Sequence, residues 1–144
     1  DGTIRIVYRS FDLFVWSAPE YLSSADSGRA MVATVATGPG GSVHAAWWNT
    51  GQDAEGVEFE RIRYREKIGE WSAGETISGP EAEAMRPNMV VDDSGHVHVA
   101  WIDKRGGFEQ IYYRYRGSSG WEEEVCLTSV LFAHYNPSLA RSCG

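Results

Sequence analysis

The residues best suited to chemistry in this chain lie in the polar, glycine-containing stretches between apolar runs. Arginine, carboxylate, amide, histidine and tyrosine side chains together could grip a sugar or an acidic ligand. Binding groups are usually carried by loops on a rigid scaffold, although a solvated polar loop surface is the plain alternative for each of them. The ligand-binding candidates are Arg29, Asn49, Asp53, Arg86, Asp103, Arg105, His134 and Tyr135.

Histidines, tryptophans and Tyr-Arg pairs that recur in register are assigned to packing instead. His44 and His98 occupy equivalent positions, and a metal site would need them to converge with further partners, so no metal and no cofactor are predicted. Trp16, Trp71 and Trp121 recur in step and are expected to pack between turns and strands. The arginine of each Tyr-Arg pair is expected to lay its stem on apolar surface and to reach solvent or a carboxylate.

The elements that must position these residues are clearest between residues 94 and 128. The segment HVHVAWI, residues 96–102, alternates its side chains between two largely apolar faces, which predicts a strand covered on both sides. The turn-like DKRGG follows it, and then the aromatic run FEQIYYRYR and the break GSSG. Glycines in both breaks supply the positive φ angles of tight connections, so the stretch is a β-meander.

This stretch is one copy of a repeat. The segment GSVHAAWW, residues 41–48, aligns with GHVHVAWI, residues 95–102, at a spacing of 54. A Tyr-Arg pair begins at Tyr8, Tyr64 and Tyr113, and a tryptophan follows each pair. Seven residues after each tryptophan comes a hydroxyl residue, which is Ser23, Ser78 or Thr128. A period of this length is typical of solenoids and propellers.

The repeat predicts an all-β fold of β-propeller-type blades, each a four-stranded antiparallel meander of about 50 residues. The 144 residues hold about three blades, with 16 Gly, 5 Pro and no long helix-forming run. Residues 1–144 are one propeller-like repeat region, made of a partial blade (1–24), two blades (29–79 and 84–129) and the first strand of a next blade (134–144).

The predicted ring is incomplete in one chain, because a propeller usually needs four to eight blades to close. An open stack of blades would expose two broad apolar faces. Either copies of the chain join as a homo-oligomer that closes the propeller, or the chain is a fragment of a longer one. The expected partners are therefore the chain itself or the rest of a longer polypeptide.

The third copy resembles the Asp-box, or BNR, repeats of sialidase-like β-propellers. The resembling pattern is an apolar strand ending in Trp, then Asp-x-Arg-x-Gly, present as Trp101, Asp103, Arg105 and Gly107. The Asp box itself, Ser-x-Asp-x-Gly-x-x-Trp, is degenerate, with Phe14 where its glycine belongs. The resemblance implies a ligand-binding rim built from the connections between second and third strands and between blades. It also favours an extracellular or periplasmic location.

Two functions follow from these observations. The preferred one is a non-catalytic, lectin-like binding or scaffold module, whose similar rim loops offer several weak sites for a glycan or a protein. The alternative is part of a sialidase-like glycoside hydrolase, for which the resemblance implies an arginine cluster, a Tyr nucleophile assisted by a Glu, and an Asp acid. These types could come from Arg29, Arg86, Arg105, Tyr135 and Asp103, but no motif fixes their roles.

Composition and charge argue against two classes of partner. Acidic residues outnumber basic ones by 20 to 13, which disfavours nucleic acid. No apolar run approaches the length of a membrane span. Cys126 and Cys143 lack the spacing of a zinc site and are expected to be free, partly buried thiols rather than a disulfide.

Overall fold

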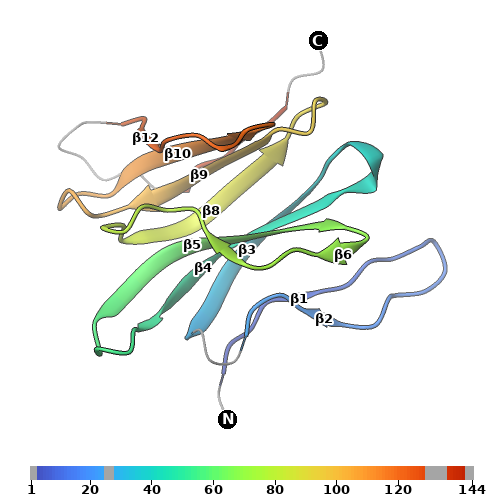
Figure 1. Cartoon of the computed structure of the whole chain (residues 1–144), viewed down its shortest axis with the longest axis horizontal. Coiled ribbons are helices and arrows are strands. Elements are labelled where there is room, and N and C mark those ends of the chain that lie inside the picture. The colour runs from blue at the N-terminus through green and yellow to red at the C-terminus, as the bar shows by residue number, and fades with distance from the viewer. Residues whose placement is uncertain (1–2, 25–27, 129–135, 142–144) are drawn as a thin grey trace.

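The computed structural model describes residues 3–24, 28–128 and 136–141, and there the chain is all-β, with three antiparallel sheets. The prediction of an all-β fold is confirmed, and the sheets do not close into a barrel. Within the described residues, the single helical turn is Pro39–Gly41, and no helix is long and apolar enough to cross a membrane. Figure 1 shows the sheets following one another from the N-terminus to the C-terminus.

We name the three sheets by their order in the chain. The N-terminal sheet contains β1 (Val7–Tyr8) and β2 (Glu20–Tyr21). The middle sheet contains β3 (Arg29–Thr37), β4 (Val43–Gln52), β5 (Glu58–Ile68), β6 (Glu70–Trp71) and β7 (Glu75–Thr76). The C-terminal sheet contains β8 (Ala84–Val91), β9 (Val97–Asp103), β10 (Gln110–Gly117), β11 (Gly120–Trp121) and β12 (Val125–Cys126).

The middle and C-terminal sheets have the same topology. In the middle sheet the strands run in the order β3-β4-β5, and both β6 and β7 pair with the far side of β5. In the C-terminal sheet β8-β9-β10 follow the same order, and both β11 and β12 pair with β10. The fourth strand expected in each repeat is therefore present as two short pieces, separated by the residues that follow the repeated tryptophan.

Strand β9 is covered on both faces, as its sequence predicts. Every residue from Val97 to Asp103 is buried except His98, which is half-buried. Val97, Val99 and Trp101 belong to the main core, which also takes in Ile62 and other side chains of the middle sheet. This core lies between the two larger sheets, and β8 packs across β3, β4 and β5. A smaller cluster around Trp47 lies between the N-terminal and middle sheets.

The repeated hydroxyl residues tie the fourth strand of each sheet to its third strand. The hydroxyl oxygens of Ser23, Ser78 and Thr128 accept hydrogen bonds from the main-chain N–H groups of Ile6, Ile62 and Ile111, at 2.9, 3.1 and 2.9 Å. Each hydroxyl oxygen takes the place of the main-chain carbonyl that a paired strand would supply. The N–H of the third strand therefore keeps a hydrogen-bond acceptor where the outer strand ends. The seven-residue spacing from each tryptophan has this structural cause.

The first strand of the repeat carries a bulge at the same place in each copy. The register of β3 with β4 shifts between Met31 and Ala33, and that of β8 with β9 shifts between Met85 and Asn88. The bulged residues Val32 and Arg86 have φ of 44° and 50°, and Asn136 has φ of 55° in the segment that follows the C-terminal sheet. A bulge re-aims the strand without ending it.

Two expectations about the C-terminal part need correction. Residues 136–141, within the predicted strand 134–144, form no strand, although Leu139 N–H donates to Asn88 Oδ1 at 2.7 Å. The segment meets β8 through the side chains of Asn88 and Arg86 and forms no main-chain ladder with that strand. Cys126 is a free thiol, but it is exposed rather than partly buried because β12 is the outer edge of its sheet. Cys143 lies outside the described residues.

Candidate functional site

The candidate residues fall on the edge of the two larger sheets where β4 and β9 end and where β3, β5, β8 and β10 begin. We call this edge the upper rim. Asp103 is the last residue of β9 and pairs with Ala84 at the start of β8 and with Gln110 at the start of β10. A residue that closes a central strand is held from both sides, so its side chain has a fixed place on the rim.

The Asp103 carboxylate is completely buried and is surrounded by hydrogen-bond donors. Its Oδ1 accepts from the main-chain N–H of Arg105 at 3.0 Å and of Glu83 at 3.3 Å. Its Oδ2 accepts from Trp101 Nε1 at 3.2 Å. The Arg105 guanidinium also forms a bidentate ion pair with the Asp103 carboxylate, in which Nε donates to Oδ1 at 3.0 Å and Nη2 donates to Oδ2 at 2.6 Å. A buried carboxylate needs such compensation.

Arg105 is shared between two carboxylates and an aromatic ring. Its Nη1 donates to Glu124 Oε1, while Glu124 Oε2 accepts from the N–H of Gly79 at 2.9 Å. Its guanidinium carbon lies 4.4 Å from the centre of the Tyr112 ring. The hydrogen bonds that Arg105 donates to Asp103, and with a smaller effect to Glu124, raise the pKa of Arg105 and outweigh the opposing effect of burial. This arginine fastens the turn after β9 to the connection after β7, and its donors are engaged within the fold.

Asn49 occupies the same place in the middle sheet, 54 residues before Asp103. It too is completely buried. Its Nδ2 donates to the carbonyl of Arg29 at 3.1 Å, and its Oδ1 accepts from Arg61 Nε at 3.3 Å. The amide thus binds the chain where β3 begins, while the exposed Arg29 side chain extends from the same segment.

The remaining candidates are spread along the rim. Asp53 caps the β4–β5 connection, where its Oδ1 accepts from the N–H of Glu55 at 3.1 Å and of Val57 at 2.8 Å. Arg86 is exposed at the β8 bulge and donates from Nη1 to Asn136 Oδ1 at 3.3 Å. His134 and Tyr135 lie outside the described residues. The structure therefore brings together Asp103 with Arg105, and Asn49 with the backbone of Arg29, but it does not gather the candidates into one cluster.

The rim also holds an acidic cavity that these candidates do not line. It has a volume of about 560 Å³ and lies between the start of β5 and the connection that leads to β8. The main chains of Glu60 and Glu83 form an isolated parallel β-bridge beside it. The main-chain N–H of Lys104 donates to the carbonyl of Glu83 at 3.3 Å. Its walls contain Thr50, Val57, Glu58, Phe59, Glu60, Pro80, Glu81, Ala82, Glu83 and Lys104.

Acidic side chains outnumber basic ones in the lining of this cavity, with four glutamates and one lysine. Burial raises the pKa of Glu60, Lys104 opposes this shift, and the nearby Glu83 and Glu58 reinforce it. A carboxyl group with a raised pKa gives up its proton less readily. The described part of the chain contains no group of three or more His, Cys, Asp or Glu side chains that could hold a metal ion. The carboxylates that line the cavity can accept hydrogen bonds from hydroxyl groups or pair with a cationic organic group.

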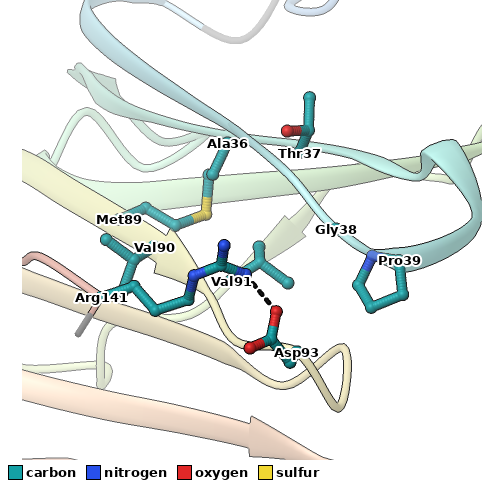
Figure 2. A pocket seen from close by; sticks show the side chains of 9 residues that line it. All are labelled: Ala36, Thr37, Gly38, Pro39, Met89, Val90, Val91, Asp93 and Arg141. Carbon is teal, nitrogen blue, oxygen red and sulfur yellow. Dashed lines mark hydrogen bonds and ion pairs between the residues drawn. The ribbon is translucent and has the colours of Figure 1, made fainter. Parts of the chain in front are cut away.

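A second cavity of about 490 Å³ lies at the opposite ends of the strands, between β3 and β8 (Figure 2). Ala36, Met89 and Val91 form its apolar part. Arg141 and Asp93 lie beside it and form an ion pair with each other. Since the two charges are already paired and the other side chains are small or apolar, this cavity offers less for recognition than the acidic one.

The arginines of two Tyr-Arg pairs lie at the contacts between consecutive sheets. Arg65 Nη1 donates to the carbonyl of Leu22 in the N-terminal sheet at 3.0 Å, and Arg114 Nη1 donates to the carbonyl of Ile77 in the middle sheet at 2.6 Å. Arg65 and Arg114 thus bind main-chain carbonyls, where solvent or a carboxylate was expected, whereas Arg9 of the first pair is exposed. The unpaired carbonyls at the end of each preceding fourth strand attract them, because a guanidinium binds several acceptors at once.

Aromatic contacts repeat across the same two boundaries. Tyr8 of the N-terminal sheet meets Trp71 edge-on with ring centres 5.2 Å apart, and Tyr64 of the middle sheet meets Trp121 edge-on at 5.1 Å. A cation from the following sheet approaches each tyrosine ring, Lys67 at 5.5 Å and Arg116 at 5.7 Å. Trp71 and Trp121 therefore pack as predicted. Trp16, in contrast, is 56% exposed.

Sequence reasoning missed several residues of these sites. Glu124 lies in the run Glu122 to Glu124, which has the appearance of a solvated surface. Glu60 and Phe59 belong to a strand, so a search restricted to loops passes over them. The periodic Tyr-Arg pair was the available signal for the contacts between sheets, but its partners are main-chain carbonyls and carry no sequence signature. Comparisons of the chain with models of protein families, with curated proteins and with solved structures found no match.

Proposed function

We propose that this chain is a β-propeller-type repeat module that works by binding rather than by catalysis. Its three sheets are successive units of one stack, and the stack continues into further like units, supplied by other copies of the chain or by the rest of a longer one. The upper rim is the surface that meets a ligand, a glycan or a protein.

One observation carries the proposal, namely that a single set of contacts joins both pairs of consecutive sheets. In each pair an arginine of the later sheet binds the carbonyl of Leu22 or Ile77 in the earlier one. In each pair a tryptophan of the later sheet meets a tyrosine of the earlier one at nearly a right angle, 79° and 88°. Identical contacts between successive units generate an assembly whose units are related by a constant rotation, as in a propeller.

Both ends of the described stack keep the corresponding groups uncovered. The N-terminal sheet presents Arg9 and Trp16, the counterparts of Arg65 and Trp71, and both are exposed. The C-terminal sheet presents Leu127, the counterpart of Leu22 and Ile77, with 56% of its surface exposed. An apolar surface of this kind on a monomer usually marks an interaction site. The two ends are complementary, so a second unit can use the same contacts.

The rim geometry supports binding over turnover. A sialidase-like site needs arginines free to hold a substrate carboxylate, whereas Arg105 already holds Asp103 and Glu124. The acidic cavity instead offers carboxylates beside Phe59 and Lys104, a combination that suits the hydroxyl groups and apolar faces of neutral sugars.

Native mass spectrometry and light scattering over a range of concentrations test the stacking. We expect assemblies of several copies, reduced to smaller species by the double change Arg9→Met and Trp16→Ala. Leu13→Ala is the matched control, because Leu13 is 81% exposed in the same hairpin and has no counterpart in the contacts between sheets. A monomer at every concentration that unfolds sharply would show that copies of the chain do not stack.

A glycan array with the purified protein tests the binding surface. Binding without turnover of a fluorogenic sialoside, and its loss on Phe59→Ala with Glu83→Gln, is the expected result. Hydrolysis of the sialoside that disappears on Arg86→Ala would replace the binding proposal by the enzymatic one.

A further inference from the structure

The connection between β1 and β2 ends in an exposed apolar tip. Leu13, Phe14 and Val15 follow one another there, and 81%, 90% and 62% of their surfaces are exposed. Figure 1 shows this connection, in blue, projecting from the side of the molecule. Single apolar side chains on a surface are ordinary, but three consecutive ones at a projecting turn form a continuous apolar surface, which is typical of an interaction site.

The equivalent hairpin tips of the other two sheets show that this position is exposed because of its place in the fold. The tip before Trp121 carries Ser118 and Ser119, and both are exposed although the middle sheet packs against their sheet. The tip before Trp71 carries Ile68, which is 74% exposed although its sheet has a neighbour on each face. Neighbouring sheets leave these tips uncovered, so large apolar residues at the first tip are not explained by packing between sheets.

The main chain of the first tip bonds largely within the tip itself. The N–H of Asp12 donates to the carbonyl of Val15 at 3.3 Å, and Asp12 Oδ1 accepts from the N–H of Phe14 at 3.4 Å and of Val15 at 3.1 Å. Phe11 and Trp16 form a β-bridge at its base, with their ring centres 5.2 Å apart. Main-chain groups with internal partners lose less when water is removed, so the tip can enter an apolar medium.

Leu13 has a backbone conformation that leucine rarely adopts. Its φ of 78° lies in the left-handed region, where glycine and asparagine are the usual residues. A bulky side chain in this region costs free energy, and the exposure of Leu13 means that burial within the fold does not offset the cost. Strained residues of this kind cluster at binding sites. A contact outside the chain would account for a leucine at this position.

The shape and charge of the tip favour a lipid surface over a folded protein. Side chains as exposed as these spread around the turn, and a fluid bilayer can enclose such a convex tip, whereas a folded partner needs a matching pocket. The connection 9–19 contains one arginine and one aspartate, in a chain of net charge -7. Among the described residues Arg9 has the Ser17 carbonyl and the Trp16 ring as partners but no carboxylate, so it can approach lipid phosphates.

We propose that the tip between β1 and β2 inserts into the interfacial region of a phospholipid bilayer, with Leu13, Phe14 and Val15 as the inserting side chains. The insertion is shallow, because the tip is far too short to span a bilayer and the Asp12 carboxylate resists transfer into hydrocarbon. The tip lies at the ends of the strands opposite the upper rim, so a chain bound in this way keeps the rim open to a ligand. The insertion requires no stacking of units.

Co-sedimentation of the full chain with phosphatidylcholine vesicles measures this insertion. We expect saturable binding that becomes about tenfold weaker or more in the double variant Leu13→Asn and Phe14→Ser. The urea midpoint of this variant should equal or exceed that of the unchanged protein, because asparagine suits the positive φ and serine occupies the equivalent tip of the C-terminal sheet. Phe108→Ser is the matched control and should bind vesicles normally, since Phe108 is an exposed phenylalanine in the connection between β9 and β10.

Lipid charge and salt separate insertion from electrostatic adsorption. Binding through apolar side chains should occur on phosphatidylcholine alone and persist at high salt, because salt screens exposed charges and leaves apolar burial intact. Binding that requires added phosphatidylserine and disappears at high salt would overturn the proposal. So would an absence of binding to phosphatidylcholine, or equal binding by the double variant and the unchanged protein.

Light scattering of the double variant distinguishes a bilayer from a second copy of the chain as the partner of the tip. The variant should assemble as the unchanged protein does, because Leu13 and Phe14 have no counterpart in the contacts between sheets. Impaired assembly of the variant, without vesicle binding by the unchanged protein, would assign the tip to a contact between copies and overturn the proposal. Vesicle binding by a chain that stays monomeric would support insertion and count against stacking of copies.

Discussion

The two boundaries between sheets share their contacts but differ in how completely they are filled. At the first boundary, between the N-terminal and middle sheets, the buried cluster holds Leu22, Ala30, Ala45 and Trp47. At the second, between the middle and C-terminal sheets, it includes Ile62, Tyr64, Ile77, Met89, Val91, Val97, Val99 and Trp101. The arginine and tryptophan contacts are the same at both.

This difference separates two roles that contacts between repeats can have. Hydrogen bonds to carbonyls and ring contacts set the angle between sheets, since they persist where the core is thin. Apolar burial sets how firmly the sheets are held, at roughly 25 cal/mol per Å² of apolar surface removed from water. The second boundary therefore carries most of the stability of the described fold.

Replacing Trp101 by alanine should produce the largest loss. Trp101 is fully buried at the second boundary, and its indole N–H donates to Asp103 at 3.2 Å. We expect a decrease of about 3–5 kcal/mol in the free energy of unfolding, measured by urea denaturation. Trp16→Ala, at a 56% exposed position of the N-terminal sheet, should change it by less than about 1 kcal/mol. Equal losses for the two changes would remove the distinction between the boundaries.

Asp103→Ala should cost nearly as much. The change leaves the Arg105 guanidinium with one carboxylate. It also removes the acceptor for the Trp101 indole N–H and for the main-chain N–H of Glu83. Removing one partner of a buried ion pair typically costs about 3–5 kcal/mol. The control is Asp12→Ala in the N-terminal sheet, where an exposed carboxylate caps the N–H of Val15 at 3.1 Å, and a loss of about 1 kcal/mol or less is expected there. A loss of that smaller size for Asp103→Ala would contradict a bracing role.

Arg114→Met should have an intermediate effect. The methionine keeps much of the apolar stem but loses the hydrogen bonds to the carbonyls of Glu122 and Ile77. Hydrogen bonds to charged groups contribute about 1.5–3 kcal/mol. The Arg9 guanidinium donates to the Ser17 carbonyl and lies 5.9 Å from the centre of the Trp16 ring, both within its own exposed hairpin. Arg9→Met should therefore lose about 1 kcal/mol or less by thermal unfolding at fixed protein concentration. If both variants lose the same amount, the contact across the boundary adds nothing.

The smallest effect is a dependence on pH that belongs to the second boundary. Burial lowers the pKa of His44 below its ordinary value of 6.5, with Glu66 opposing and Arg116 reinforcing the shift. The unfolded chain therefore binds a proton more readily, so this contribution to stability is fully present above pH 6.5 and is lost as pH falls toward the folded pKa. Urea midpoints at pH 7.5 and 5.5 should differ less in His44→Gln than in the unchanged protein. An identical pH dependence in both would exclude His44 as its source.

Much of the fold was accessible from the sequence because its signals are local and repeated. Alternation in β9, the glycine turns and the spacing between Trp71 and Ser78 each report on a few neighbouring residues. The upper rim was less accessible. Asp103 is followed by Lys-Arg-Gly-Gly and has the pattern of a solvated turn, yet its burial depends on Glu83 and Glu124, whose approach requires the folded sheets. Partners that are main-chain atoms leave no trace in side-chain patterns.

The bulge in the first strand shows how such a fold tolerates change. Asn136 takes its positive φ readily, whereas the β-branched Val32 takes a φ of 44° only at an energetic penalty. The bulge is kept in β3 nonetheless, because slipping the register by one residue would turn every side chain of the strand to the opposite face. Backbone geometry in this chain is thus dictated by the pairing of whole strands. Individual positions are left free to diverge, which explains how the repeat can stay recognisable in shape while its sequence drifts.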